Sequence, residues 1–165
     1  MITRLLVPLD DTNFYTAIAA CLEDYPVNGS CSASVHGAMP DWNVSLVTNM
    51  AFAFRGEPGV QNSAPTFDAD ISRWDTSAVT DMSGMFIRAA AFDQPLAAWN
   101  VSRVTDMEAM FYDASAFAQD ITGWTTTALQ RSTDMFSGAD AWQTVFERNS
   151  TAAGGLFDGP PSAWQ

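Results

Sequence analysis

The sequence predicts an α/β fold, a short solenoid of about four strand–helix repeats with a cap at each end. Three observations predict it. Large apolar residues recur every 25 positions, the spacing within each repeat changes from alternation to steps of three and four, and both ends of the chain lack the repeat. A fixed period of this length is typical of stacked units that bury their apolar faces only against their neighbours.

The 25-residue period is clearest in the side chains expected to form the core. Trp74, Trp99 and Trp124, for example, are spaced 25 residues apart. A single unit buries too few side chains to offset its conformational entropy, so we expect the units to be stable only when stacked. The predicted repeat core comprises Trp74, Val79, Met82, Met85, Phe86, Phe92, Trp99, Val104, Met107, Met110, Phe111, Phe117, Trp124, Met135 and Phe136.

Within one unit, the pattern predicts a short strand followed by a helix of one to two turns. Trp99 and Val101 alternate as in a strand, whereas the apolar residues of 104–117 step by three and four as in a helix. Thr105 and Glu108 have the spacing of a capping box at the start of that helix.

The register of the repeat divides the chain into three parts. Residues 1–38 are expected to form an N-terminal segment with a capping helix, residues 39–142 the repeat region, and residues 143–165 an irregular C-terminal cap. The individual repeats span about 39–71, 72–96, 97–121 and 122–142.

The first repeat carries an insertion. Phe54 precedes Phe86 by 32 residues, whereas Phe67 precedes Phe92 by 25, so seven extra residues fall in the loop 55–66. This loop is rich in Gly and Pro and is the one irregularity of the repeat, which makes it the candidate contact site. Its candidate contact residues are Arg55, Glu57, Pro58, Val60, Gln61 and Asn62.

The two cysteines, Cys21 and Cys31, lie on the expected capping helix and in the loop after it. In an oxidising compartment, a disulfide here would stabilise the cap by roughly 2 to 3 kcal/mol. In a reducing compartment, the same pair would be two small buried thiols, and both readings stay open. Only His36 lies nearby, so the four ligands of a zinc site are missing.

The composition limits the partners that the protein can have. There are 19 acidic residues against seven basic ones, all arginine, for a net charge of -12. This charge disfavours nucleic acid and anionic lipid and suits basic protein surfaces, although it also serves solubility. No apolar run is long enough to span a membrane, and no signal peptide is visible, so localisation stays open.

Two copies of the repeat carry a family resemblance. Residues 74–86 read WDTSAVTDMSGMF and residues 99–111 read WNVSRVTDMEAMF. This motif resembles the repeat of the BspA-like, DUF285 family, which is found in bacterial surface proteins and lipoproteins and in predicted proteins of microalgae. The flanks look like those of the microalgal type, and the resemblance covers about residues 39–142. It implies a right-handed, leucine-rich-repeat-like solenoid that serves adhesion or protein interaction and has no known catalytic residues. The fourth copy departs from the motif at residues 125–129.

Several polar residues recur in register and raise alternatives. The acidic pairs are Asp81 with Asp106, Asp68 with Asp93, and Asp70 with Asp120. Such columns bind Ca²⁺ in some solenoids, but first-turn helix positions explain Asp81 and Asp106 without a metal. Asn43, Asn100 and Asn149 begin glycosylation sequons, which would matter only in a eukaryotic secreted protein.

No catalytic constellation is visible in the sequence. His36 is the one histidine, and no nucleophile elbow, phosphate loop or dinucleotide motif is present. We therefore expect a non-enzymatic protein without a cofactor that binds other proteins, as an accessory subunit of a larger assembly or as a cell-surface adhesion module. A carbohydrate- or ice-binding surface and, more remotely, an Asp-based hydrolase are the alternatives.

Overall fold

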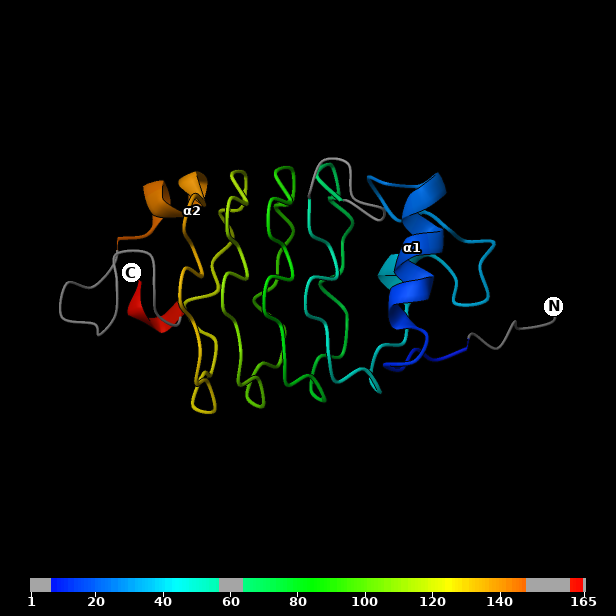
Figure 1. The fold of residues 1–165 in the computed structure, drawn as a ribbon, viewed down its shortest axis with the longest axis horizontal. Coiled ribbons are helices and arrows are strands. Elements are labelled where there is room, and N and C mark those ends of the chain that lie inside the picture. The colour runs from blue at the N-terminus through cyan, green and yellow to red at the C-terminus, as the bar shows by residue number, and fades with distance from the viewer. Residues whose placement is uncertain (1–6, 57–63, 148–160, 165) are drawn as a thin grey trace.

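The structure is a computed structural model and describes residues 7–56, 64–147 and 161–164 (Figure 1). Its helices are α1 (Phe14–Asp24) near the N-terminus and α2 (Asp140–Val145) after the repeats. Two short 3₁₀ helices, η1 (Met39–Asp41) and η2 (Pro161–Ala163), complete the regular elements of the described residues. Between η1 and α2 the chain makes a series of bends that lie side by side, with α1 at one end of the stack and α2 at the other (Figure 1).

The predicted α/β solenoid of strand–helix repeats, with its leucine-rich-repeat-like architecture, is wrong. Residues 42–56 and 64–139 contain neither a helix nor a strand, and pairing between neighbouring units occurs only as isolated parallel bridges. These bridges join Asn49 to Asp81, Asp81 to Asp106, and Asp106 to Arg131.

The physical reason lies in where the backbone hydrogen bonds go. The N–H of Met107 donates to Arg131 O, and the N–H of Ala109 donates to Thr133 O, each at 2.9 Å. An α-helix needs those N–H groups to bond four residues back, so bonds to the next unit preclude it. Ala109 also has φ 54°, in the left-handed region, which breaks a right-handed helix. The capping box does not form, because the Glu108 N–H donates to the Asp106 carboxylate instead.

The 25-residue segments nevertheless stack regularly. We call residues 39–71, 72–96, 97–121 and 122–142 the first to fourth layers. The N–H of Phe86 donates to Met110 O, which joins the second layer to the third. The N–H of Phe111 donates to Met135 O, which joins the third layer to the fourth, and both bonds are 2.9 Å long. Thr105 N–H donates to Thr80 O at 2.8 Å, so bonds run in both directions between layers. Bonds between layers therefore alternate with turn bonds inside each layer, such as Met110 N–H to Met107 O, and together they satisfy the backbone.

Aromatic columns run through the stack. Trp42, Trp74, Trp99 and Trp124 form one column, with neighbouring ring centroids 6.2 to 6.5 Å apart and ring planes within 8° of parallel. Each indole also binds the backbone, as Trp99 Nε1 does by donating to Ile71 O at 3.1 Å. Such pairs contribute about 0.5 to 1.5 kcal/mol each beyond the burial of their area. All the repeat-core residues predicted from the sequence are buried, with at most 5 % of any of them exposed.

The two ends of the stack are closed by different elements. At the N-terminal end, α1 buries Phe14, Ile18 and Leu22, and the Phe14 ring meets Trp74 edge to face at 5.9 Å. At the C-terminal end, Trp142 of α2 stacks on Phe136 at 4.5 Å. Both ends therefore cover the aromatic columns, as exposed repeat ends require.

Candidate interaction surfaces

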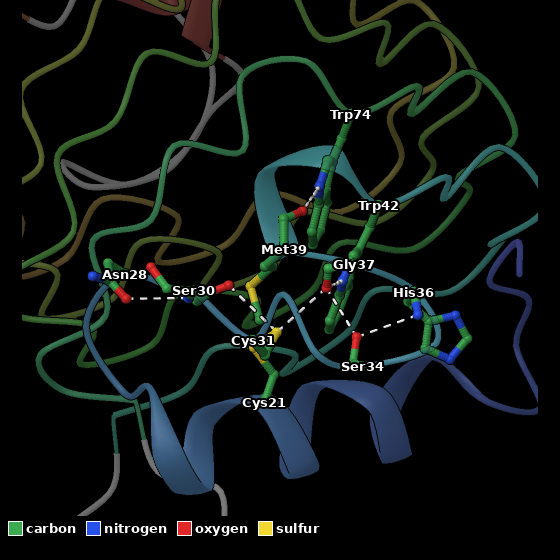
Figure 2. Close-up of a disulfide and its surroundings, with 11 residues drawn as sticks. Cys21, Asn28, Ser30, Cys31, Ser34, His36, Gly37, Met39, Trp42 and Trp74 are labelled. Atoms are coloured by element: carbon green, nitrogen blue, oxygen red, sulfur yellow. Dashed lines mark hydrogen bonds between the residues drawn. A yellow bond between two sulfur atoms is a disulfide. The ribbon is translucent and has the colours of Figure 1, made fainter. Parts of the chain in front are cut away.

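The N-terminal cap is tied to the loop that follows it by a disulfide between Cys21 of α1 and Cys31 (Figure 2). The loop is also held by its own polar groups. Ser34 Oγ and Trp42 Nε1 both donate to Gly37 O, at 2.9 Å each. Cap, loop and first layer are thus joined covalently and by hydrogen bonds.

A pocket of about 260 Å³ lies between α1 and this loop. Thr16, Ala17 and Ala20 line its helix side, and Val35 and His36 line its loop side. The imidazole Nδ1 of His36 lies 2.8 Å from Val7 O, and the cysteine sulfurs are bonded to each other. These walls supply contact area, and His36 Nδ1 and both cysteine sulfurs are already engaged.

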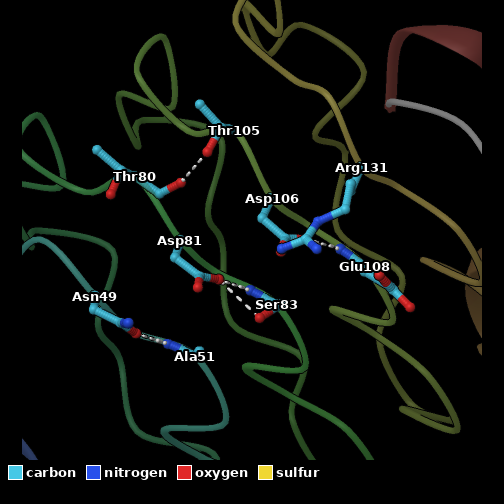
Figure 3. A network of polar contacts seen from close by, with 9 residues as sticks. All are labelled: Asn49, Ala51, Thr80, Asp81, Ser83, Thr105, Asp106, Glu108 and Arg131. Carbon is cyan, nitrogen blue, oxygen red and sulfur yellow. Dashed lines mark hydrogen bonds and ion pairs between the residues drawn. The ribbon is translucent and has the colours of Figure 1, made fainter.

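A polar column runs across the layers at Asn49, Asp81 and Asp106 (Figure 3). In each of them, Oδ1 accepts the N–H of the residue two positions later at 2.9 Å. These bonds close one turn per layer, so the expected role of Asp81 and Asp106 in the first turn of a helix is replaced by turn closure. Asp106 is only 5 % exposed and pairs with Arg131 of the fourth layer.

A second acidic column links layers directly. Asp68 Oδ1 accepts the N–H of Asp93 at 3.0 Å and the Gln94 amide at 2.8 Å. One layer on, Asp93 Oδ1 accepts the N–H of Ala118 and the Gln119 amide, both at 2.9 Å. Each carboxylate therefore bonds a backbone and a side-chain donor of the next layer.

Other Asp side chains close turns locally, because each accepts the N–H of the residue two positions later in the chain. Asp75 lies in register with Asn100, and the hydroxyl and then the N–H of Ser77 hold the pKa of the Asp75 carboxyl below its usual value. Asp70 and Asp120 have lowered pKa values for the same reason, through Ser72 and Thr122.

The asparagines of two glycosylation sequons, Asn43 and Asn100, also close turns of this kind. Asn43 and Asn100 are exposed, and their side-chain oxygens accept the hydroxyls of Ser45 and Ser102 at 2.7 and 2.8 Å. Asn149 lies outside the described residues.

Comparison with known protein families shows which family the chain belongs to. Residues 28–149 match the family described as "Mycoplasma protein of unknown function, DUF285". The chain belongs to the DUF285 family. This confirms the resemblance seen in the repeat motif. No curated protein and no solved structure matches the chain.

The candidate contact loop of this DUF285 chain lies mostly outside the described residues. The candidate contact residues that lie outside the described ranges are Glu57, Pro58, Val60, Gln61 and Asn62. Arg55 is described and partly buried, and its carbonyl accepts the N–H of Ala64 at 2.8 Å. Arg55 and Ala64 therefore bracket the insertion.

The described residues form neither a metal-binding cluster nor a helix that could span a membrane. Over 7–56, 64–147 and 161–164, no group of three or more His, Cys, Asp or Glu side chains is placed to hold a metal ion. The same stretches include no helix with the length and apolar character needed to cross a membrane.

Among the described residues, the large exposed apolar side chains of this DUF285 chain lie mostly in its N-terminal cap and first layer, and the repeat pattern alone did not single them out. Most of the large ones among the described residues belong to the cap or the first layer, namely Val7, Tyr15, Tyr25, Val27, Val35, Leu46 and Phe52, whereas Val145 lies on α2. A comparison of equivalent repeat positions in the sequence does single out Leu46 and Phe52, because the later layers carry small or charged residues at these positions. This end of the molecule is the best candidate for contact with a partner.

Proposed function

We propose that this DUF285 chain is a non-enzymatic protein that binds other proteins. The observation that carries the proposal is the concentration of exposed apolar side chains on the cap and first layer of an otherwise strongly acidic chain. Exposed apolar groups that gather on one part of a surface are typical of interaction sites.

The use of the polar side chains supports a non-enzymatic role. Asp68, Asp93 and Asp106, three of the carboxylates that recur in register, accept hydrogen bonds that hold turns or join layers. A general acid or base must instead face a substrate with its proton-transferring atom. The acidic columns therefore serve the architecture, which is the simplest account of their recurrence.

The disulfide bears on the setting in which the protein works. Disulfides persist in oxidising compartments and are rare where glutathione keeps thiols reduced. The Cys21–Cys31 bond therefore favours adhesion at a cell surface over assembly in a reducing compartment. An accessory subunit of an extracytoplasmic assembly fits the same observation.

Affinity capture followed by reconstitution tests the proposal. The oxidised chain, immobilised through its C-terminus, is exposed to solubilised surface and soluble fractions of the source cells, and each captured protein is then purified and titrated against the chain. The same chain unfolded in urea during capture is the control. We expect saturable binding of at least one purified protein to the folded chain only. Hydrolysis of peptide, ester or glycoside substrates that Asp106→Asn abolishes, without any saturable partner, would contradict the proposal.

A further inference from the structure

The first layer presents large apolar side chains at two positions where the other layers do not. Leu46 is 58 % exposed and Phe52 is 48 % exposed. The residues in register with Leu46 are Ala78, Arg103 and Ala128, and those in register with Phe52 are Gly84, Ala109 and Asp134. The repeat thus acts as its own control, because the architecture does not need a large apolar residue at either position.

Phe52 occupies its position in spite of an unfavourable backbone. Its φ is 59°, and the equivalent residues have φ between 54° and 57°. A bulky side chain rarely adopts this left-handed conformation, which suits Gly and, less well, Asp or Asn. Strain of this kind is concentrated at functional sites, where the surrounding structure enforces it.

The surrounding structure does hold Phe52 firmly. The Tyr15 hydroxyl of α1 donates to Ala51 O at 2.9 Å, and the N–H of Phe52 donates to Ser83 O at 2.9 Å. The ring lies against Gly84, where no side chain displaces it. A partner that binds the ring therefore meets a rigid anchor and loses little entropy in ordering it.

Two carboxylates lie beside Tyr15 at this edge of the first layer. The carboxylates of Asp11 and Asp81 lie close enough to Tyr15 to affect its ionisation. Asp11 also accepts the Thr48 hydroxyl and the N–H groups of Thr48 and Asn49, so its charge is fixed at this edge of the first layer. Arg55, the arginine nearest in sequence, is partly buried. Aromatic rings flanked by carboxylates attract arginine and lysine side chains, both by charge and through the ring faces.

We propose that Tyr15, Leu46 and Phe52 form a docking surface for an extended segment of a partner protein in which arginine or lysine alternates with apolar residues. This inference rests on the proposed function and names the surface and the chemistry of the partner. The apolar residues of the segment cover Leu46 and the Phe52 ring, and its cations face Asp11 and Asp81.

Phe52→Gly is the decisive variant, because glycine already occupies the equivalent position of the second layer and relieves the left-handed strain. Loss of binding in this variant therefore cannot be ascribed to unfolding, which a thermal melt checks. Val145→Ala is the control, since Val145 is also an exposed apolar residue, at 59 %, but lies on α2 at the other end of the stack.

The probes are three fluorescein-labelled synthetic peptides of equal length, with alternating Arg and Leu, Arg and Ser, or Glu and Leu. Fluorescence anisotropy is measured at an ionic strength of about 150 mM, where long-range charge attraction is screened. We expect the Arg–Leu peptide to bind the wild-type chain and Val145→Ala alike. Phe52→Gly should bind it at least about tenfold more weakly, as expected for loss of a central aromatic anchor. The Glu–Leu peptide should not bind.

Three results would overturn the docking surface. These are undiminished binding by Phe52→Gly, equal affinity for the Arg–Ser and Arg–Leu peptides, or a dimer of the wild-type chain in sedimentation that Phe52→Gly abolishes. A captured natural partner that binds Phe52→Gly as tightly as the wild type would refute this surface and leave the proposed function intact.

Discussion

The ring of Phe52 packs so closely on Gly84 that a Cβ atom at position 84 would lie 2.5 Å from its Cε1 atom. The two residues occupy equivalent positions in successive layers, and both have left-handed backbones, with φ of 59° and 57°. One layer therefore provides the space that the side chain of the previous layer fills.

This relationship predicts a dependence between the two positions. Gly84→Ala should destabilise the protein by about 1 to 3 kcal/mol, from the left-handed Ala and the clash with the ring. In the Phe52→Gly background the same substitution should cost about 1 kcal/mol less, because the ring is gone. Urea denaturation of the four proteins of this cycle measures the difference. Additive effects would show that ring and glycine are not in contact.

Ala109 offers an internal comparison for the backbone term alone. It has φ 54° at the equivalent position of the third layer. Ala109→Gly should stabilise the protein by about 0.5 to 1 kcal/mol, since glycine tolerates this conformation and the gain exceeds its greater freedom in the unfolded chain. A destabilisation in the same urea titration would contradict the assigned backbone strain.

The second acidic column predicts a large effect at Asp93. Asp93→Ala removes the acceptor of the Ala118 N–H and the Gln119 amide and should destabilise the protein by about 1 to 3 kcal/mol. Asp93→Asn keeps an acceptor oxygen and should lose less. Asp120→Ala is the control, because Asp120 is exposed and accepts the N–H of Thr122, only two residues further along the chain. Equal losses for Asp93→Ala and Asp120→Ala would argue against a special role for bonds between layers.

The disulfide should stabilise the cap without organising the stack. Replacing both Cys21 and Cys31 by Ala should lower the free energy of unfolding by about 2 to 3 kcal/mol, mainly through the greater freedom of the unfolded chain. The near-ultraviolet circular dichroism of the stacked tryptophans should be retained, because the bond joins only α1 and its loop. Addition of a reductant to the wild type should reproduce the loss of stability. A wild type insensitive to reductant and free of disulfide by mass spectrometry would contradict the bond.

Tyr15 predicts a loss of stability at alkaline pH. Burial, and then the negative charges of Asp81 and Asp11, raise the pKa of the Tyr15 phenol to about 12. Because the folded pKa is raised above the usual value of 10.0, the folded state holds this proton more tightly. The associated stability is therefore fully present below pH 10 and is lost as the pH rises toward 12. Thermal melts of wild type and Tyr15→Phe should converge over this range, and parallel curves would contradict the shift.

Two residues of the proposed docking surface could be predicted from the sequence, and the third could not. Leu46 and Phe52 stand out once positions in register are compared, so the sequence held the signal. Tyr15 could not be found in this way, because it lies on α1, outside the repeat, and meets Ala51 only through the fold. The sequence does not decide whether Cys21 pairs with Cys31 for a similar reason, since ten residues of separation do not fix the distance between two side chains.

The sequence by itself determined the period of the stack and the family to which the chain belongs, because the period is written in residues such as Trp74, Trp99 and Trp124. The tertiary structure alone decided the backbone. Steps of three residues from Val104 to Met107 to Met110 predicted a helix, yet they arise from successive turns, in which Val104 N–H donates to Val101 O and Met110 N–H to Met107 O. Local spacing cannot distinguish the two conformations, because the choice depends on whether N–H groups such as those of Met107 and Ala109 bond four residues back or to carbonyls about 25 residues away.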